Sequence, residues 1–180
     1  MLFRSSCLPI PTSSRTNKSL NDINFSEGDI LRVIRKLDPN KAHGHDQISI
    51  RMIQICDKTI SKPLFLIFNS CMQSGVFPSE WKMANVVPVY KKNDKQNIKN
   101  YRTVSLLPIF GKIFERIIYN EMYPFFILNE LISPNQSGFK QGDSCINQLL
   151  SITHDIYQSL DEGYEVRGVF LDISKAFDKV

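Results

Sequence analysis

Several signatures of common protein classes are missing from this sequence of 180 residues. No apolar run approaches the roughly 20 residues needed to span a bilayer, and the N-terminus lacks the uninterrupted apolar core of a signal peptide. We therefore expect no membrane partner and a cytoplasmic or nuclear location. Glycine and proline, with eight and nine residues, are too few for a collagen-like or low-complexity chain.

Cysteine is also scarce, and the four cysteines contain no Cys-x-x-Cys pair. This spacing does not support a zinc ribbon, and a disulfide framework is not expected in an intracellular chain. Because free cysteine is among the most often buried residue types, we interpret all four as small interior hydrophobes. His43 and His45 stand two apart in a turn and are interpreted as incidental, since structural zinc takes four ligands.

Positive charge is concentrated in one segment. The net charge is +4, yet residues 82–102 alone carry six basic residues against one acidic residue, Asp94, while the rest has 16 basic and 17 acidic residues. A local excess of this kind is expected for binding the phosphates of a nucleotide or of a nucleic-acid backbone. Charge alone allows a solvated lysine-rich loop equally well.

Hydrophobic periodicity predicts helices before and after this segment. Residues 1–24 show no periodicity and are interpreted as a flexible leader. Ser26 is expected to cap a helix whose apolar stripe ends at Leu37. Residues 48–72 predict two helices with a break near Pro63, and Gly75 ends the second.

The basic segment itself is predicted to be a β-hairpin. Residues 86–90 and 101–107 are the two strands, and the basic loop lies at the tip; Pro88 places the first strand at an edge. An amphipathic helix follows, ending or kinking near Pro124. A further helix is expected from Asp143 or Ser144 to about residue 160.

Residues 166–173 are predicted to form a buried strand that presents Asp172 at its C-terminal end, where a helix begins. A carboxylate fixed at a strand end can hold Mg²⁺ against a phosphate. Taken without further context, this position favours the alternative, an aspartate that caps the next helix. No Gly-x-x-x-x-Gly-Lys-Ser/Thr loop is present. Ser174 also occupies the position where a haloacid-dehalogenase-like phosphatase would need a second aspartate.

The sequence FLDISKAFD at residues 170–178 strongly resembles the first catalytic motif of the reverse transcriptases of LINE-type (non-LTR) retrotransposons. Four earlier segments resemble other motifs of the same family, in family order: GHDQI at 44–48, GVFPSEWK at 75–82, NYRTVSLL at 100–107 and SPNQSGFK at 133–140.

This resemblance implies an α+β, helix-rich fragment of the right-hand polymerase fold, with a helical N-terminal region, a fingers β-hairpin and the first palm strand. Residues 25–180 would be a partial reverse transcriptase domain after the leader at 1–24. The family's second catalytic motif, Tyr/Phe-Ala-Asp-Asp, does not occur in the chain. We therefore expect the C-terminal palm and thumb to be missing and the chain alone to be inactive.

The implied reaction is RNA-directed DNA synthesis, in which two Mg²⁺ (or Mn²⁺) ions assist transfer from a dNTP to the 3′-hydroxyl of a DNA primer on an RNA template. By resemblance, Asp172 would ligate both ions and the Ile173 backbone carbonyl would assist one. Phe177 would be the steric gate that disfavours a ribose 2′-hydroxyl.

The resemblance also assigns binding roles to basic residues. Lys91 or Lys92 and Arg102 would grip the incoming triphosphate, for which Arg offers a bidentate fork and Lys a mobile point charge. Lys140 would contact the template backbone. The alternative is a non-catalytic remnant that binds nucleic acid through the basic hairpin.

Overall fold

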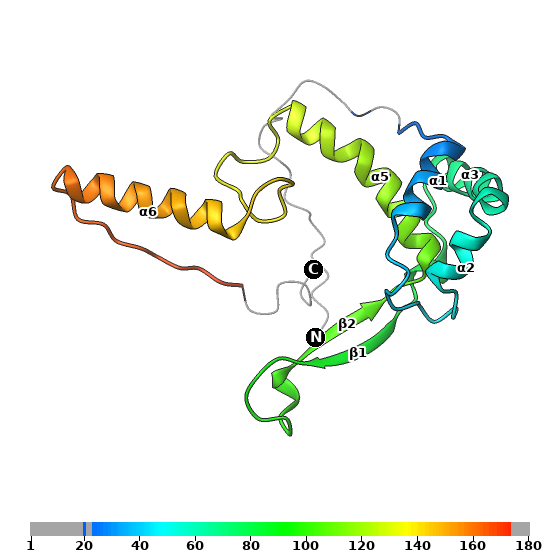
Figure 1. Ribbon diagram of the computed structural model, residues 1–180, viewed down its shortest axis with the longest axis horizontal. Helices are drawn as coiled ribbons and strands as arrows, with labels where there is room; N and C mark the ends of the chain where they lie inside the picture. Colours follow the sequence, from blue (N-terminus) through cyan, green and yellow to red (C-terminus); the bar gives the residue numbers. More distant parts are fainter. Residues whose placement is uncertain (1–19, 21–22, 174–180) are drawn as a thin grey trace, which may run out of the picture. The chain divides into compact units, whose positions relative to one another are not determined.

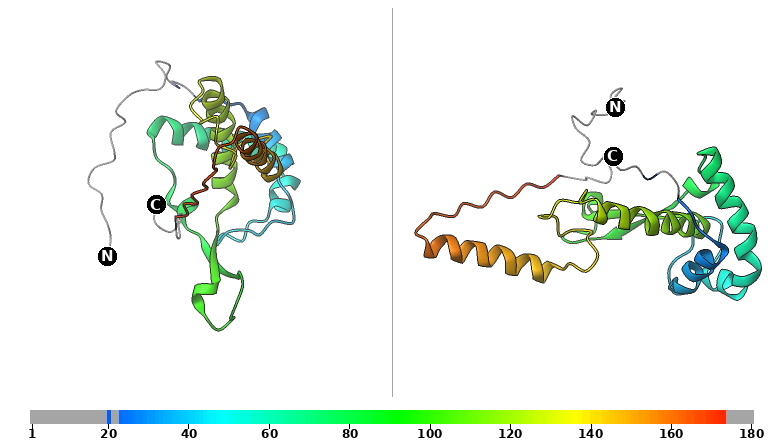
Figure 2. Two further views of the ribbon diagram at one scale, coloured as in Figure 1. Left: turned by 90° about the vertical axis from the view of Figure 1, so that its left-hand side faces the viewer. Right: turned by 90° about the horizontal axis from the view of Figure 1, so that it is seen from above.

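The computed structural model describes residue 20 and residues 23–173. The predicted leader, apart from residues 20, 23 and 24, and the predicted helix start at Ser174 lie outside these residues. The chain divides into two compact units, Met1–Leu131 and Ile132–Val180. Within the first unit, the helices α1, α2 and α3 gather around the N-terminal half of α5, and the hairpin of β1 and β2 projects from the same end (Figures 1 and 2).

Helix α1 (Glu27–Lys36) begins as predicted at Ser26. The Ser26 hydroxyl accepts a hydrogen bond from the Asp29 backbone N–H, and the Asp29 carboxylate accepts one from the Ser26 backbone N–H. This capping box satisfies two N–H groups that would otherwise lack partners. The predicted apolar stripe is buried at its centre, with Ile30 and Ile34 fully covered.

The two predicted helices of residues 48–72 are α2 (Ile50–Ile55) and α3 (Asp57–Ser74), and Gly75 ends α3 in a left-handed conformation with φ 65°. The predicted break near Pro63 is wrong, because the chain breaks at Cys56 and Pro63 lies inside α3. Proline removes one intrahelical hydrogen bond. The next turn, however, buries Leu64 and Phe68 in the core, and this burial favours a continuous helix.

The predicted hairpin is confirmed. After the short helix α4 (Ser79–Lys82), strands β1 (Asn85–Tyr90) and β2 (Tyr101–Leu106) pair antiparallel, with Val87 opposite Val104 and Val89 opposite Arg102. A 3-10 turn, η1 (Ile98–Asn100), precedes β2. Since the described sheet has two strands, both are edge strands, and Pro88 is tolerated there.

Helix α5 (Ile109–Leu128) follows β2 through Pro108. Of the two predicted outcomes near Pro124, an end is wrong, because the helix continues through Pro124 to Leu128. Pro124 lies near the C-terminus, where the loss of one hydrogen bond costs little. The Asn129 side-chain amide also donates to the Phe125 carbonyl at 2.8 Å, which secures the last turn.

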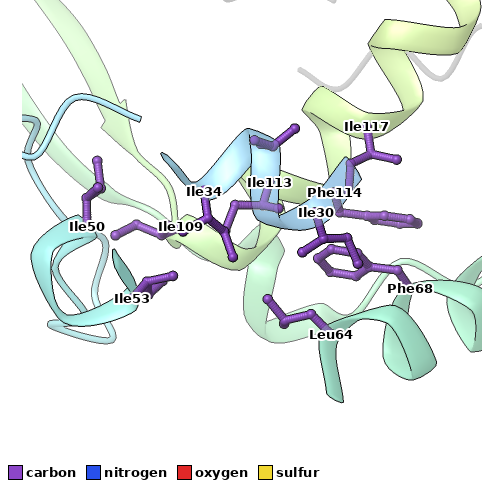
Figure 3. Close-up of a cluster of buried hydrophobic side chains, with 11 residues drawn as sticks. Ile30, Ile34, Ile50, Ile53, Leu64, Phe68, Ile109, Ile113, Phe114 and Ile117 are labelled. Atoms are coloured by element: carbon purple, nitrogen blue, oxygen red, sulfur yellow. The ribbon is translucent and has the colours of Figure 1, made fainter. Parts of the chain in front are cut away.

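The core of the first unit is built from α1, α2, α3 and α5 (Figure 3). Phe68 of α3 stacks on Phe114 of α5 with ring centroids 4.8 Å apart. Phe77 and Trp81, both partly buried, pack against Phe114 with centroid distances of 5.9 and 6.1 Å. The buried hydrophobic residues are Ile30, Val33, Ile34, Ile50, Ile53, Leu64, Phe68, Ile109, Ile113, Phe114 and Ile117.

The expected burial of the cysteines is wrong for Cys56 and Cys145, whereas Cys71 packs against the core. Cys56 and Cys145 are exposed and Cys71 is half-buried, while Cys7 lies outside the described residues. Cys56 lies at the junction of α2 and α3, where its Sγ–H donates to the Met52 carbonyl at 3.1 Å. Cys145 is the first residue of α6, a helix with no buried residue.

The second unit contains α6 (Cys145–Asp161), which Ser144 caps through the Asn147 backbone N–H. The predicted buried strand at 166–173 is wrong: these residues form no strand, and Phe170 and Leu171 are 98% and 93% exposed. Strand formation requires backbone partners. In the described part of the chain, β1 and β2 pair with each other, and no further strand is present to pair with this segment.

Among the described residues, no helix is long and apolar enough to cross a membrane.

Candidate functional site

The hairpin brings the predicted triphosphate-binding residues of the first unit together. Arg102 lies opposite Val89 in the register, and the Lys91 backbone N–H donates to the Asn100 carbonyl at 2.8 Å, which extends the ladder by one residue pair. Side chains alternate between the faces of a strand, and cross-strand positions share a face. Lys91 and Arg102 are therefore diagonal neighbours on one face, and Lys92 follows in the bend beyond the strand.

The tip of the hairpin is ordered by hydrogen bonds that its own sequence supplies. The Asp94 carboxylate accepts from the Gln96 backbone N–H at 2.9 Å, and the Asp94 carbonyl accepts from the Asn100 side-chain amide at 2.8 Å. The Asn97 side chain accepts from the Lys99 backbone N–H at 3.0 Å. These bonds hold the loop in one conformation although it is exposed to solvent.

Two tyrosines close the base of this tip. Tyr90 and Tyr101 are cross-strand partners whose rings meet edge to face at 5.7 Å. The Tyr101 hydroxyl donates to the Lys95 carbonyl at 2.9 Å, and the Tyr90 hydroxyl bonds the Asn93 carbonyl. The Lys95 ammonium lies 5.5 Å from the centre of the Tyr90 ring. We did not predict this arrangement from the sequence, although an aromatic residue at each strand end was a visible signal for it.

The cations of the hairpin are available to an external anion. None of the ion pairs between described residues involves a hairpin cation. The one hairpin acid, Asp94, accepts a hydrogen bond from the backbone instead. The cations are exposed and of like charge, so their mutual repulsion would be relieved by a bound phosphate. They are Lys91, Lys92, Lys95, Lys99 and Arg102.

The base of the hairpin is fixed by a close backbone contact. A Cβ atom on Gly44 would lie 2.6 Å from the Pro108 backbone nitrogen and 2.8 Å from the Leu107 carbonyl carbon. The turn at residues 44–48 therefore packs directly on the link between β2 and α5. His45 of this turn places Nε2 3.8 Å from a Glu80 carboxylate oxygen.

The remaining predicted site residues belong to the second unit. Asp172 and Ile173 lie in the exposed segment without regular structure, and Phe177 lies outside the described residues. The described residues contain no group of three or more His, Cys, Asp and Glu side chains that could hold a metal ion. Asp172 offers an exposed carboxylate, the oxygen ligand type that Mg²⁺ prefers, but one carboxylate cannot hold two ions.

Lys140 lies half-buried in the turns before α6. Its carbonyl accepts a hydrogen bond from the Asp143 backbone N–H at 3.3 Å. The pKa of Asp143 is lowered, mainly by a hydrogen bond from the Ser144 backbone N–H, with the Lys140 charge as a smaller cause. Lys140 is thus a neighbour of the Asp143 carboxylate, although the two form no ion pair.

Comparison with known proteins identifies the class. The family model described as "Reverse transcriptase (RNA-dependent DNA polymerase)" matches residues 90–180, which is half of the chain. This span begins at the last residue of β1 and includes the basic loop, β2 and Asp172. The chain therefore belongs to the reverse transcriptase family.

Curated relatives come from mobile elements. The chain is 33% identical over 153 residues to the RNA-directed DNA polymerase from mobile element jockey of Drosophila melanogaster, covering 84% of this chain and 17% of that protein. It is 29% identical over 153 residues, with the same coverage, to the probable RNA-directed DNA polymerase from transposon BS of the same species. A transposon TX1 uncharacterized 149 kDa protein from Xenopus laevis is 27% identical over 173 residues, which is 96% of this chain and 13% of that protein. The chain thus spans less than a fifth of the length of these relatives.

Proposed function

We propose that this chain is the fingers region and the beginning of the palm of an RNA-directed DNA polymerase from a non-LTR retrotransposon, and that its hairpin binds the triphosphate of the incoming dNTP. The observation that supports this proposal is the cluster of unpaired cations on one ordered hairpin in a member of the reverse transcriptase family. The fold assignment rests on the resemblance of the motifs and on the hairpin preceding Asp172 in the chain.

Each cationic side chain of the hairpin would contact the triphosphate in a different way. The Arg102 guanidinium can donate two parallel hydrogen bonds to one phosphate, and its neighbour Lys91 adds a charge on the same face. Lys92, in the bend that follows, adds a further exposed charge. Because the tip is already held by its tyrosines and by Asp94, little backbone conformational entropy is lost on binding.

Asp172 would supply a ligand to divalent metal, Mg²⁺ or Mn²⁺, and the Ile173 carbonyl a second oxygen. When bound, two such ions stabilise the charge on the attacking and leaving oxygens of nucleotidyl transfer. Among the described residues, no group of three or more His, Cys, Asp and Glu side chains is placed to complete such a site. Phe177 would act as the steric gate and Lys140 as a template-backbone contact; the partners would be an RNA template, a DNA primer and dNTP.

A second candidate function is nucleic-acid binding without catalysis. The hairpin cations all belong to the first unit, whereas Asp172 belongs to the second. Binding through the hairpin therefore does not require the catalytic carboxylate.

Binding of a fluorescent dNTP to the purified chain with and without Mg²⁺ tests the proposal. Arg102→Gln should weaken binding about tenfold, as expected for a lost charge-assisted hydrogen bond. Arg51→Gln is the matched control, because Arg51 is an exposed cation of α2 outside the hairpin. Equal effects of the two changes would overturn the hairpin assignment.

Asp172→Ala separates the two candidate functions. A loss of the Mg²⁺-dependent part of dNTP binding supports the polymerase function, whereas an unchanged affinity for dNTP together with salt-sensitive RNA binding supports the remnant. Primer extension on an RNA template by the chain alone is expected to give no product. Mg²⁺-dependent synthesis in that assay would show that the chain needs no further catalytic motif.

A further inference from the structure

A second group of cations lines a cavity between α1 and α5, away from the hairpin sequence. The cavity has a volume of about 350 Å³ and is lined by Arg32 and Lys36 of α1 and by Arg116 and Asn120 of α5, with Val33 among its apolar residues. This volume lies within the usual range for small-ligand sites, roughly 300–1,000 Å³. It exceeds what one phosphate group and a few water molecules need.

The four polar side chains are exposed, and the packing of the core fixes the backbone positions that carry them. Arg32 and Lys36 are four residues apart on α1, and Arg116 and Asn120 are four apart on α5, so each pair shares one face of its helix. Ile34 of α1 and Ile113 of α5 are fully buried in the cluster that joins the two helices (Figure 3). The backbone positions of the cationic residues relative to one another therefore follow from the packing of the two helices.

The one acid at the cavity is already engaged. One carboxylate oxygen of Asp29 accepts from the Ser26 backbone N–H at 2.9 Å and from the Ser26 hydroxyl at 2.6 Å. The other carboxylate oxygen lies 3.1 Å from a terminal nitrogen of Arg32. Asp29 thus orients the Arg32 guanidinium, whose other N–H groups remain free to donate.

The other two cations are unpaired with any acid of the described residues. Lys36 and Arg116 take part in none of the ion pairs there. The Arg116 guanidinium carbon lies 5.3 Å from the centre of the Tyr119 ring, which restricts its orientation. The cavity thus carries three cations and one carboxylate. In addition, Arg32 and Lys36 are like charges at a repulsive i, i+4 spacing.

From this geometry we infer a second phosphate site, independent of the hairpin, in which Arg32, Lys36 and Arg116 bind a phosphate-type anion. The Asn120 amide can donate a further hydrogen bond, and Val33 provides an apolar surface beside the anion. The phosphate is either one of a polynucleotide backbone or one of a free polyphosphate. The site uses no residue of the hairpin, so it can be tested independently of the proposed dNTP site.

Titration of the isotope-labelled chain with inorganic pyrophosphate, followed by amide chemical shifts, locates the site. We expect saturable shifts in residues 29–37 and 116–120 in addition to any shifts in residues 91–102. Arg116→Gln and, independently, Lys36→Gln should each lower the pyrophosphate affinity that residues 29–37 and 116–120 report about three- to tenfold. The affinity that residues 91–102 report should stay unchanged. Shifts confined to the hairpin would overturn the inference.

Two matched variants control for loss of net charge. Arg51→Gln and Lys62→Gln remove exposed cations of α2 and α3 that lie outside the cavity. If these changes weaken the shifts of residues 29–37 as much as Arg116→Gln and Lys36→Gln do, the cavity binds no specific anion and the inference is wrong. Thermal melts of all four variants confirm that each remains folded.

Single-stranded RNA distinguishes the source of the phosphate. If RNA produces the same shifts in residues 29–37 and Arg116→Gln weakens RNA binding more than Arg51→Gln does, the ligand is a polynucleotide backbone. If pyrophosphate binds there but RNA does not, the ligand is a free polyphosphate. Binding of neither probe at the cavity contradicts the proposal.

Discussion

The α-carbon of Gly44 packs so closely on Pro108 that a Cβ atom there would lie 2.6 Å from the proline nitrogen. The contact joins two positions that are far apart in the sequence, because α2, α3, α4 and the whole hairpin lie between them. Pro108 follows β2 closely and immediately precedes α5, so Gly44 braces the hairpin at its base. The glycine is required by this close approach of two backbones and not by an unusual backbone angle.

Gly44→Ala should therefore destabilise the first unit by about 1–3 kcal/mol, because the new methyl group meets backbone atoms that cannot rotate away. Urea unfolding followed by Trp81 fluorescence measures this change. Gly28→Ala is the control, since its Cβ would meet only the Ser26 hydroxyl oxygen at 3.5 Å, an ordinary contact. Alanine at position 28 of α1 should be neutral or stabilising by up to about 1 kcal/mol. Equal destabilisation by both changes would contradict the bracing role.

Tyr101→Phe should loosen the tip of the hairpin without unfolding the core. The change removes the hydrogen bond to the Lys95 carbonyl but keeps the ring contact with Tyr90. We expect about threefold to tenfold faster amide hydrogen exchange at residues 95–100, the range given by one hydrogen bond of roughly 1 kcal/mol. Tyr119→Phe serves as the control on α5. Exchange that is unchanged in Tyr101→Phe would show that the bond does not order the loop.

The capping box of α1 should make stability depend on pH in the acid range. Hydrogen bonds from the Ser26 hydroxyl and backbone N–H, in that order, lower the pKa of Asp29, with the Arg32 charge as a smaller cause. A lowered pKa means that the stabilisation is complete above the unfolded value, about 3.9, and is lost as the pH falls through the folded value. Because Asp29 is partly exposed, the contribution is small.

Asp29→Asn should lower stability above pH 5, and its difference from the natural chain should shrink as the pH falls below about 4. Urea unfolding over this pH range measures the difference. Glu27→Gln removes the other acid of the first turn, which takes no part in the capping box, and is the matched control. A difference for Asp29→Asn that stays constant down to pH 2 would exclude a role for its charge.

The exposed apolar segment around Asp172 should promote self-association. Val169, Phe170 and Leu171 are 82%, 98% and 93% exposed, so their replacement removes no packing. Phe170→Lys should reduce light scattering at high protein concentration and leave the unfolding transition unchanged. Phe68→Ala, in contrast, should cost about 3–5 kcal/mol, because Phe68 is fully buried. If Phe170→Lys destabilises the chain to a similar extent, the segment is packed in solution.

The local sequence was sufficient to predict features whose backbone hydrogen bonds are made within one helix end or one hairpin. The Ser26 cap, the Gly75 stop and the hairpin were predicted correctly, because their signals lie within a few residues of the feature. The expected helix break at Pro63 and the expected helix end at Pro124 were wrong, because the packing of neighbouring residues and a side-chain cap offset one lost hydrogen bond each. The expected burial failed for Cys56 and Cys145, because it used a general tendency of the residue type.

In the candidate site, too, the sequence predicted local features but not those that depend on contacts between distant residues. The charge count located the hairpin cations, and the motif sequence located Asp172, but neither could show that Tyr90 and Tyr101 order the hairpin tip. The cavity of Arg32, Lys36 and Arg116 was also not predicted, since Arg116 is far from α1 in the sequence. Only the crossing of two helices brings these cations together.

The sequence by itself determined the family, the helical caps and the placement of positive charge, because motifs and capping patterns are local. The tertiary structure alone decided that Gly44 lies against Pro108, that α1 and α5 share a cationic cavity, and that residues 166–173 are exposed. Each of these depends on which distant segments meet. An apolar, β-branched segment becomes a buried strand only when another strand offers its backbone N–H and C=O groups, and no described strand does so here.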